Sequence, residues 1–163
     1  MSSVRQADNE FEGHELLFRR FSQEGYNQEA HQILDASFEY PHFSVNRQKH
    51  SDRPEDVISP PYERWGFAEI RVNELPEPRD VVERCGNEPE KPITIHVVDA
   101  PEPGNKAHAE VRLRFDGDEK PGHSKPRSFR KKFRIMLAER FRILKLPSGI
   151  SPPDQSPTAP QLG

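Results

Sequence analysis

The stretch APEPGNKAHAEVRLRF, residues 100–115, decides the fold because it joins a turn-forming run to a strict alternation of residue types. From Ala107 to Phe115, apolar residues at odd positions alternate with polar and charged residues at even positions. This period of two predicts a half-buried strand, with one face on the core and the other facing solvent or a ligand. Two prolines stiffen the preceding loop, and Gly104-Asn105 tolerate a left-handed turn.

Three other segments are predicted to be strands of the same sheet. Ile93–Asp99 is the most β-branched run of the chain, and Trp65–Val72 alternates in the same way. Leu16–Phe21 is a short early segment that can join them. Because a short loop separates Ile93–Asp99 from Ala107–Phe115, we expect a mostly antiparallel sheet.

The clearest helical pattern is SFRKKFRIMLAERFRILKL, Ser128–Leu146. Ser128 can cap its beginning and Pro147 stops it. Its apolar residues recur at helical spacing: Phe129, Phe133, Met136, Leu137, Phe141 and Leu144. The predicted fold is therefore α+β, a small, mostly antiparallel sheet with a C-terminal amphipathic helix packed on one face.

The composition bounds the domain organisation. A chain of 163 residues has room for one domain, here predicted over residues 13–146. Residues 1–12 are polar and predicted to be disordered, as is the Pro/Ser-rich tail 147–163. Cys85 is the only cysteine, which excludes an internal disulfide, and it cannot build a thiolate metal site alone. No apolar run approaches the roughly 20 residues of a membrane span, so we expect a cytoplasmic protein without membrane contact.

The net charge of -3 hides an asymmetry. Residues 123–163 hold nine Lys or Arg against two acidic residues, a surplus of seven positive charges, so residues 1–122 carry a charge of -10. Such a basic segment either binds an acidic partner, such as nucleic acid, or packs against the acidic body of its own chain.

The first candidate site is the polar face of two strands. His96 lies on one strand, and His108 and Glu110 lie two apart on the next. If the strands pair, the three side chains share a face, where a His-x-Glu pair can act as acid and base or hold a metal. A solvated face of mixed charge explains the same pattern.

The second candidate is Arg19 and Arg20 with Ser37 and Ser44. An Arg at the end of an early strand, followed by Ser-containing extended segments, resembles the start of ADP-ribosyltransferase-like toxin domains, where an Arg contacts the dinucleotide. The resemblance implies that a later strand Glu, such as Glu110, supplies the catalytic carboxylate. Otherwise the two arginines are surface residues that pair with the acidic body.

The third candidate is the basic side of the predicted helix. Its positive charges can contact phosphates or another acidic surface, while the aromatic side belongs to the core. A solvated surface is the competing explanation. The residues of this side are Arg127, Lys131, Arg134, Arg142 and Lys145. No phosphate loop, Ser-His-Asp spacing or zinc-ligand pattern is present, so no metal and no cofactor is predicted.

Three stretches taken in order resemble an uncharacterised family of small bacterial proteins: ELLFRRF (15–21), ASFEYPHFSVNR (36–47) and VVDAPEPGNKAHAEV (97–111). Those proteins carry a Leu/Tyr-Arg-Arg segment, a Phe/Leu-Ser-Val-x-Arg segment and a Pro-x-Pro-x-Asn-x-Ala-His-Ala segment, and have no established activity. The resemblance implies a component of a bacterial multi-gene system, such as a defence or toxin–antitoxin locus. It singles out Arg19, Arg20, Phe38, Ser44, Arg47, Asn105 and His108.

These observations predict a non-enzymatic binding or accessory protein whose basic helix contacts an acidic partner. That partner is expected to be another protein of the same system, with nucleic acid as the other choice. The competing class is an enzyme, ADP-ribosyltransferase-like or metal-dependent, that uses Arg19, Arg20, His108 and Glu110. The enzyme hypothesis requires its candidate catalytic residues to converge in one cleft: Arg20, Ser44, His108 and Glu110.

Overall fold

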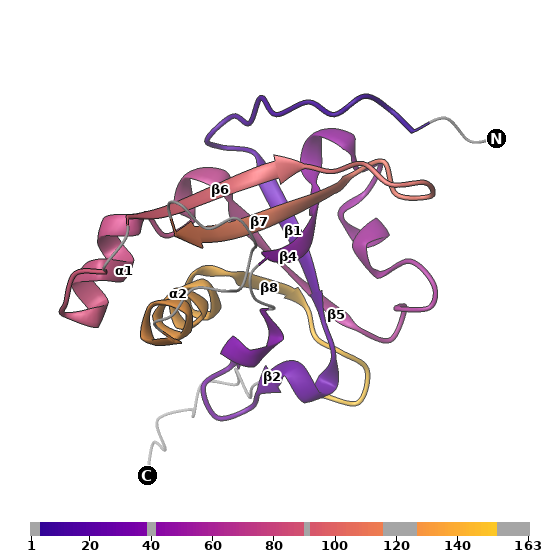
Figure 1. Cartoon of the computed structure of the whole chain (residues 1–163). Helices are drawn as coiled ribbons and strands as arrows, with labels where there is room; N and C mark the ends of the chain where they lie inside the picture. The colour runs from indigo at the N-terminus through magenta and orange to yellow at the C-terminus, as the bar shows by residue number, and fades with distance from the viewer. Residues whose placement is uncertain (1–3, 39–41, 90–91, 116–126, 153–163) are drawn as a thin grey trace, which may run out of the picture.

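The computed structural model describes residues 4–38, 42–89, 92–115 and 127–152. Within them, six strands form an antiparallel sheet in the order β6-β7-β4-β1-β5-β8 (Figure 1). These strands are β1 (Leu16–Phe21), β4 (His42–Arg47), β5 (Gly66–Arg71), β6 (Ile93–Asp99), β7 (His108–Phe115) and β8 (Arg142–Lys145). A small ribbon pairs β2 (Tyr26–Asn27) with β3 (Gln32–Ile33), and the α-helices are α1 (Pro78–Cys85) and α2 (Arg127–Arg140). The fold is α+β with a mostly antiparallel sheet.

The predicted strands agree closely with the structure. Leu16–Phe21 and Ile93–Asp99 coincide with β1 and β6, whereas the predictions for β5 and β7 run one residue too far at one or both ends. β6 and β7 pair antiparallel from Ile93↔Phe115 to Asp99↔Ala109. The alternation located β7 because its two faces differ in burial, whereas β6 was located by its β-branched residues.

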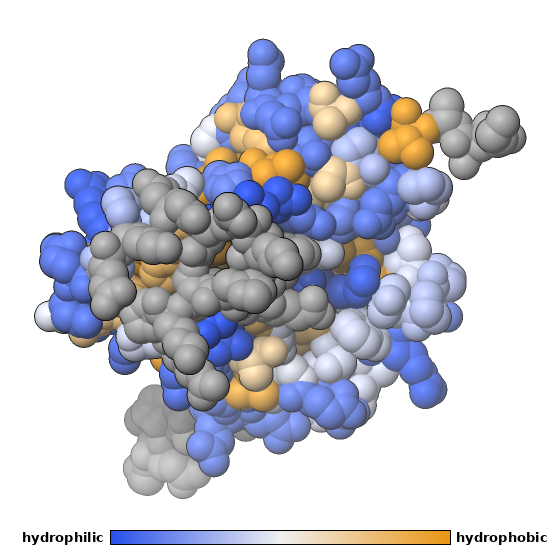
Figure 2. Space-filling model, viewed as in Figure 1, coloured by the Kyte–Doolittle hydropathy of each residue, from blue (hydrophilic) through white to orange (hydrophobic). Residues whose placement is uncertain are grey.

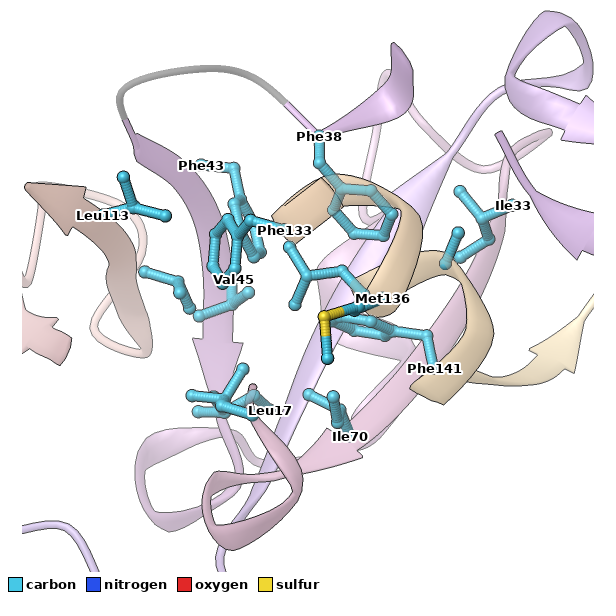
Figure 3. Packing of buried hydrophobic residues seen from close by; sticks show 14 of the residues in the cluster. Leu17, Ile33, Phe38, Phe43, Val45, Ile70, Leu113, Phe133, Met136 and Phe141 are labelled. Carbon is cyan, nitrogen blue, oxygen red and sulfur yellow. The ribbon is translucent and has the colours of Figure 1, made fainter. Parts of the chain in front are cut away.

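One face of the sheet carries the main hydrophobic core (Figure 3). Phe38 packs between Phe43 of β4 and Phe141 at the end of α2, with ring centroids 5.2 and 5.3 Å apart. The other labelled side chains of this cluster are Leu17, Ile33, Val45, Ile70, Leu113, Phe133 and Met136. Aromatic burial of this extent joins α2 to the sheet.

The predicted helix over Ser128–Leu146 is too long, because α2 ends at Arg140 and residues Arg142–Lys145 form the edge strand β8. β8 satisfies the backbone groups along the outer edge of β5, which the helix would have left unpaired. Gly66 allows this approach, since a Cβ there would lie 2.3 Å from the carbonyl oxygen of Lys145.

The opposite face of the sheet is covered only in part. Phe18 of β1 and Phe67 of β5 form a second buried cluster with Val57 and Ile58. Val57 and Ile58 belong to the 3-10 segment η4 (Pro54–Ile58), which follows the 3-10 segment η3 (Gln48–His50). The other described 3-10 segments are η1 (Gln23–Gly25), η2 (Asp35–Ser37) and η5 (Val72–Glu74). Figure 1 shows α1 and α2 beside one another, away from the η3–η4 segment. The polar residues of β7 lie on this partly covered face.

The N-terminal segment, predicted to be disordered, lies against the sheet from Arg5 onward. Arg5 and the amide of Asp8 both donate hydrogen bonds to the carboxylate of Asp99, at 2.7 Å for Arg5 Nη2. Arg47, whose side chain is fully buried, holds Glu15 by hydrogen bonds of 2.9 and 3.0 Å and donates to the carbonyl oxygen of Asp8. This buried ionic network, absent from the prediction, ties the segment to β4 and β6.

The C-terminal tail is described only in its first residues. The amide of Ser148 donates a 2.8 Å hydrogen bond to the carbonyl oxygen of Arg64, so the chain after β8 returns to the loop before β5. The rest of the predicted tail, residues 153–163, lies outside the described residues. In the described part of the chain, no helix has both the length and the apolar character needed to cross a membrane. On the face seen in Figure 2, most of the described surface is hydrophilic, with small apolar areas.

Candidate functional site

His108 and Ser44 are brought together by the pairing of β4 with β7. The register Asn46↔His108 and Ser44↔Glu110 places all four side chains on the same face. His108 Nδ1 lies 2.7 Å from the carbonyl oxygen of Ala100, and Nε2 lies 3.0 Å from Ser44 Oγ. Because a carbonyl oxygen only accepts, Nδ1 carries a proton and donates it to Ala100; in the neutral tautomer, Nε2 then accepts from the Ser44 hydroxyl.

This geometry has a chemical and a structural consequence. A neutral imidazole that accepts a hydroxyl proton is oriented as a general base. The same two hydrogen bonds satisfy the nitrogens of His108, which is 6% exposed, and fasten the start of β7 to Ala100.

Glu110 accepts two hydrogen bonds from Arg112, at 2.7 and 3.1 Å. His96 lies opposite Arg112 in the register of β6 and β7. Burial, together with the positive charges of Arg114 and Arg112, lowers the pKa of His96. The imidazole is therefore neutral at pH 7. Among the residues that the structure describes, no three His, Cys, Asp or Glu side chains are grouped to hold a metal ion.

A cleft of about 490 Å³ opens next to Ser44 and His108. Its walls are the η3–η4 segment and the loop before β7, and its floor includes Arg20 of β1 and Asn46 of β4. The side chain of Asn105 on the loop donates to Asn46 Oδ1 at 3.0 Å and accepts from the amide of Ala107 at 3.2 Å. Asn105 thus fixes the loop that forms one wall of the cleft.

The four candidate catalytic residues are divided between two neighbouring places. Ser44, His108 and Glu110 adjoin one another on β4 and β7, whereas Arg20 alone of the four lines the cleft. Arg20 Cζ lies 3.7 Å from the centroid of the Tyr62 ring. The four candidate catalytic residues therefore share one face of the sheet but do not converge in one cleft.

Arg19 points to the opposite face and has a structural role. Its guanidinium donates 2.8 Å hydrogen bonds to the carbonyl oxygens of Ser44 and Ser37. It does not line the cleft, and its two printed hydrogen bonds join β1 to the backbone of β4 and η2.

The basic side predicted for one long helix is split by the strand β8. Arg142 pairs with Glu74 at 2.7 Å and lies 3.8 Å from Glu69, and Lys145 donates to the carbonyl oxygens of Glu63 and Trp65. The end of the basic segment therefore packs against the acidic body of its own chain.

The other predicted cations of this side lie on α2. Lys131 is exposed and Arg134 is half-buried, and neither forms an ion pair with any residue that the structure describes. Arg127 is the first residue of α2, but its side chain lies outside the described part of the chain. These three residues are what remains of the predicted basic surface.

Sequence reasoning missed the residues that shape the cleft. Tyr62 and His50 lie in segments without periodicity, and Asn46 is an ordinary polar residue of β4. The one available signal was PPYERW at residues 60–65, where aromatic residues follow turn-forming prolines.

Comparison of the chain with protein-family models, with curated proteins and with solved structures gives no match. The resemblance to small bacterial proteins therefore stays a prediction, and the functional argument depends on the geometry.

Proposed function

We propose that the chain is a non-enzymatic binding protein, an accessory component of a bacterial multi-gene system, that contacts an acidic macromolecule through the basic side of α2. The partner we favour is another protein of that system, and nucleic acid is the other outcome of the test.

The observation that carries this proposal is the spacing of the cations on α2. Arg127, Lys131 and Arg134 follow one another at intervals of four and three residues, which places them on one side of a helix. The other side is occupied, because Phe129 and Phe133 are buried in the core. The helix is therefore held in place by its aromatic residues, while Lys131 on the other side is exposed and Arg134 is half-buried.

The charge distribution supports the same conclusion. Arg140 lies 3.9 Å from Asp80 and Arg142 pairs with Glu74, so the end of the basic segment is neutralised within the chain. Lys131 and Arg134 lack such a partner in the described regions. A local positive surface on a chain of net charge -3 favours a specific acidic contact over general attraction to polyanions.

The test is a binding titration with three labelled probes: single-stranded DNA, double-stranded DNA and a polyglutamate peptide. Fluorescence anisotropy is measured for the wild type and for Lys131→Glu/Arg134→Glu over a series of salt concentrations. We expect the double substitution to weaken binding at least roughly tenfold. If the bound probe is a nucleic acid, the double substitution should also reduce the slope of log binding constant against log salt concentration by about two in magnitude.

The matched control is Arg64→Glu/Arg79→Glu, which changes the charge equally at two exposed positions outside α2. Equal loss of binding in both double variants would show that only net charge matters and would refute the proposal. Absence of binding to all three probes at low salt would refute it as well. Binding to polyglutamate but not to DNA would identify an acidic protein surface as the partner.

A second candidate function is an enzyme that uses Arg20 and His108, and one observation favours it: the Ser44 hydroxyl donates to His108 Nε2 next to the cleft that Arg20 lines. The ADP-ribosyltransferase-like form predicts NAD cleavage, followed by ¹H NMR. Turnover that His108→Asn abolishes and Arg79→Gln leaves intact would support it, and a rate equal to that of buffer would exclude this form.

A further inference from the structure

We propose that the cleft between the η3–η4 segment and the loop before β7 binds a small molecule through a carboxylate or phosphate group held by Arg20. This site is separate from the α2 surface and does not depend on the function proposed for it. The volume of about 490 Å³ lies within the range of small-ligand pockets.

Arg20 is held in place but retains most of its donors. Its guanidinium lies over Tyr62, whose ring packs edge-on against Trp65 at 5.0 Å. Among the described contacts, its one hydrogen bond is a long one, 3.4 Å to the carbonyl oxygen of Val57. Stacking fixes the plane of the guanidinium, so that its remaining N–H groups can bind an oxyanion in a bidentate manner at little entropic cost.

The other cations of the cleft already have partners. Arg5 is bound to Asp99, and Lys106 donates to Asp52 at 2.9 Å. Asp56, the acid nearest in the chain to Val57, accepts from the amide of Arg53 at 3.1 Å. Arg20 makes no ion pair with any residue in the described ranges, so an incoming oxyanion would supply the missing negative charge.

His50 adds a second polar group at the wall of the cleft. Its Nε2 is enclosed and has no hydrogen-bond partner among the residues that the structure describes, which is uncommon for a buried nitrogen. Burial and the charges of Arg5 and Arg47 lower the pKa of this imidazole, which is therefore neutral at pH 7. A ligand that reaches His50 would satisfy Nε2 as well as Arg20.

The single tryptophan of the chain, Trp65, provides the readout, because it packs against the tyrosine beneath Arg20. Fluorescence is titrated with inorganic phosphate and, separately, with acetate, against sodium chloride of equal ionic strength. We expect saturation by at least one oxyanion below about 50 mM, since one charged group gives millimolar affinity. The phosphate and acetate arms then identify the preferred oxyanion.

Arg20→Gln should weaken the oxyanion affinity roughly tenfold or more, and Arg20→Lys should restore only part of it because an ammonium lacks the planar fork. Arg79→Gln, at an exposed position of α1, is the matched control and should bind as the wild type does. Amide shifts in ¹H–¹⁵N spectra on adding phosphate or acetate should centre on Tyr62 and His50. No saturation with either oxyanion, or unchanged affinity in folded Arg20→Gln, would overturn the proposal.

Discussion

Replacing Arg47 by methionine tests the buried ionic network. Arg47 is fully buried and holds Glu15, which is 7% exposed, while its Nη1 lies 3.6 Å from Asp99. Removing the cation leaves Glu15 buried without its charge partner. Breaking such a pair costs about 3–5 kcal/mol of unfolding free energy. For a domain of this size, we expect the melting temperature to fall by about 10 °C.

The double variant Arg47→Met/Glu15→Leu separates the charge from the packing. Replacing a buried ion pair by apolar residues of similar volume is often neutral, so the double variant should regain more than half of the lost stability. Arg79→Met, at an exposed position, should change the unfolding free energy by less than about 0.5 kcal/mol. Urea unfolding, followed by Trp65 fluorescence and by circular dichroism, measures all three variants.

Two results would contradict this reasoning. A loss of less than about 1 kcal/mol in Arg47→Met would mean that Glu15 reaches solvent or takes up a proton without penalty. A double variant that is less stable than Arg47→Met would mean that Arg47 acts mainly through the N-terminal carbonyl oxygens. Hydrogen exchange of residues 5–15 distinguishes the two cases. If Arg47 acts mainly through the N-terminal carbonyl oxygens, the amides of residues 5–15 should exchange fast in the double variant.

Three further predictions concern single positions. Gly66→Ala should cost about 2 kcal/mol or more, measured by urea unfolding, because its Cβ would meet the carbonyl oxygen of Lys145 at 2.3 Å. Ser44→Ala should cost about 1–2 kcal/mol and speed hydrogen exchange at Ala100, since His108 Nε2 loses its partner; unchanged exchange would contradict it. Burial alone would raise the pKa of Asp99, but the hydrogen bonds and charges of its partners lower it below 3.8, so its stabilisation is present above that pH and is lost as the pH falls through the folded-state pKa. In Asp99→Asn, the urea concentration at the unfolding midpoint should therefore fall less steeply than in the wild type as the pH is lowered into the acid range.

Local pattern was sufficient for the strands that have two unlike faces. In β7 the odd positions are buried and the even positions are more exposed, apart from His108 at its start, so the alternation in the sequence equals the alternation in burial. β6 was located by its β-branched residues instead, and β1 by its short apolar alternation, although burial does not alternate strictly along either strand. Asn105 could likewise be expected to set the register of the loop, because its side chain bonds the backbone two residues later.

Local pattern failed where a distant partner decided the conformation. Residues Arg142–Lys145 continue a helical spacing, but β5 offers an open edge and Gly66 lets them approach it. The N-terminal residues look like a polar tail, yet Asp99 and Arg47 bind them from positions far along the chain. In both cases the decisive energy comes from hydrogen bonds between segments that no local window contains.

The candidate site shows the same division. The sequence by itself predicted that His108 and Glu110 share the polar face of one strand, whereas it placed Ser44 only in an extended segment. Only the tertiary structure decided that β4 pairs with β7 in the register that joins Ser44 to His108, and that Arg20 lies apart in a cleft over Tyr62. The physical reason is that side-chain direction follows from local backbone geometry, whereas strand neighbours are chosen by the burial of the whole sheet.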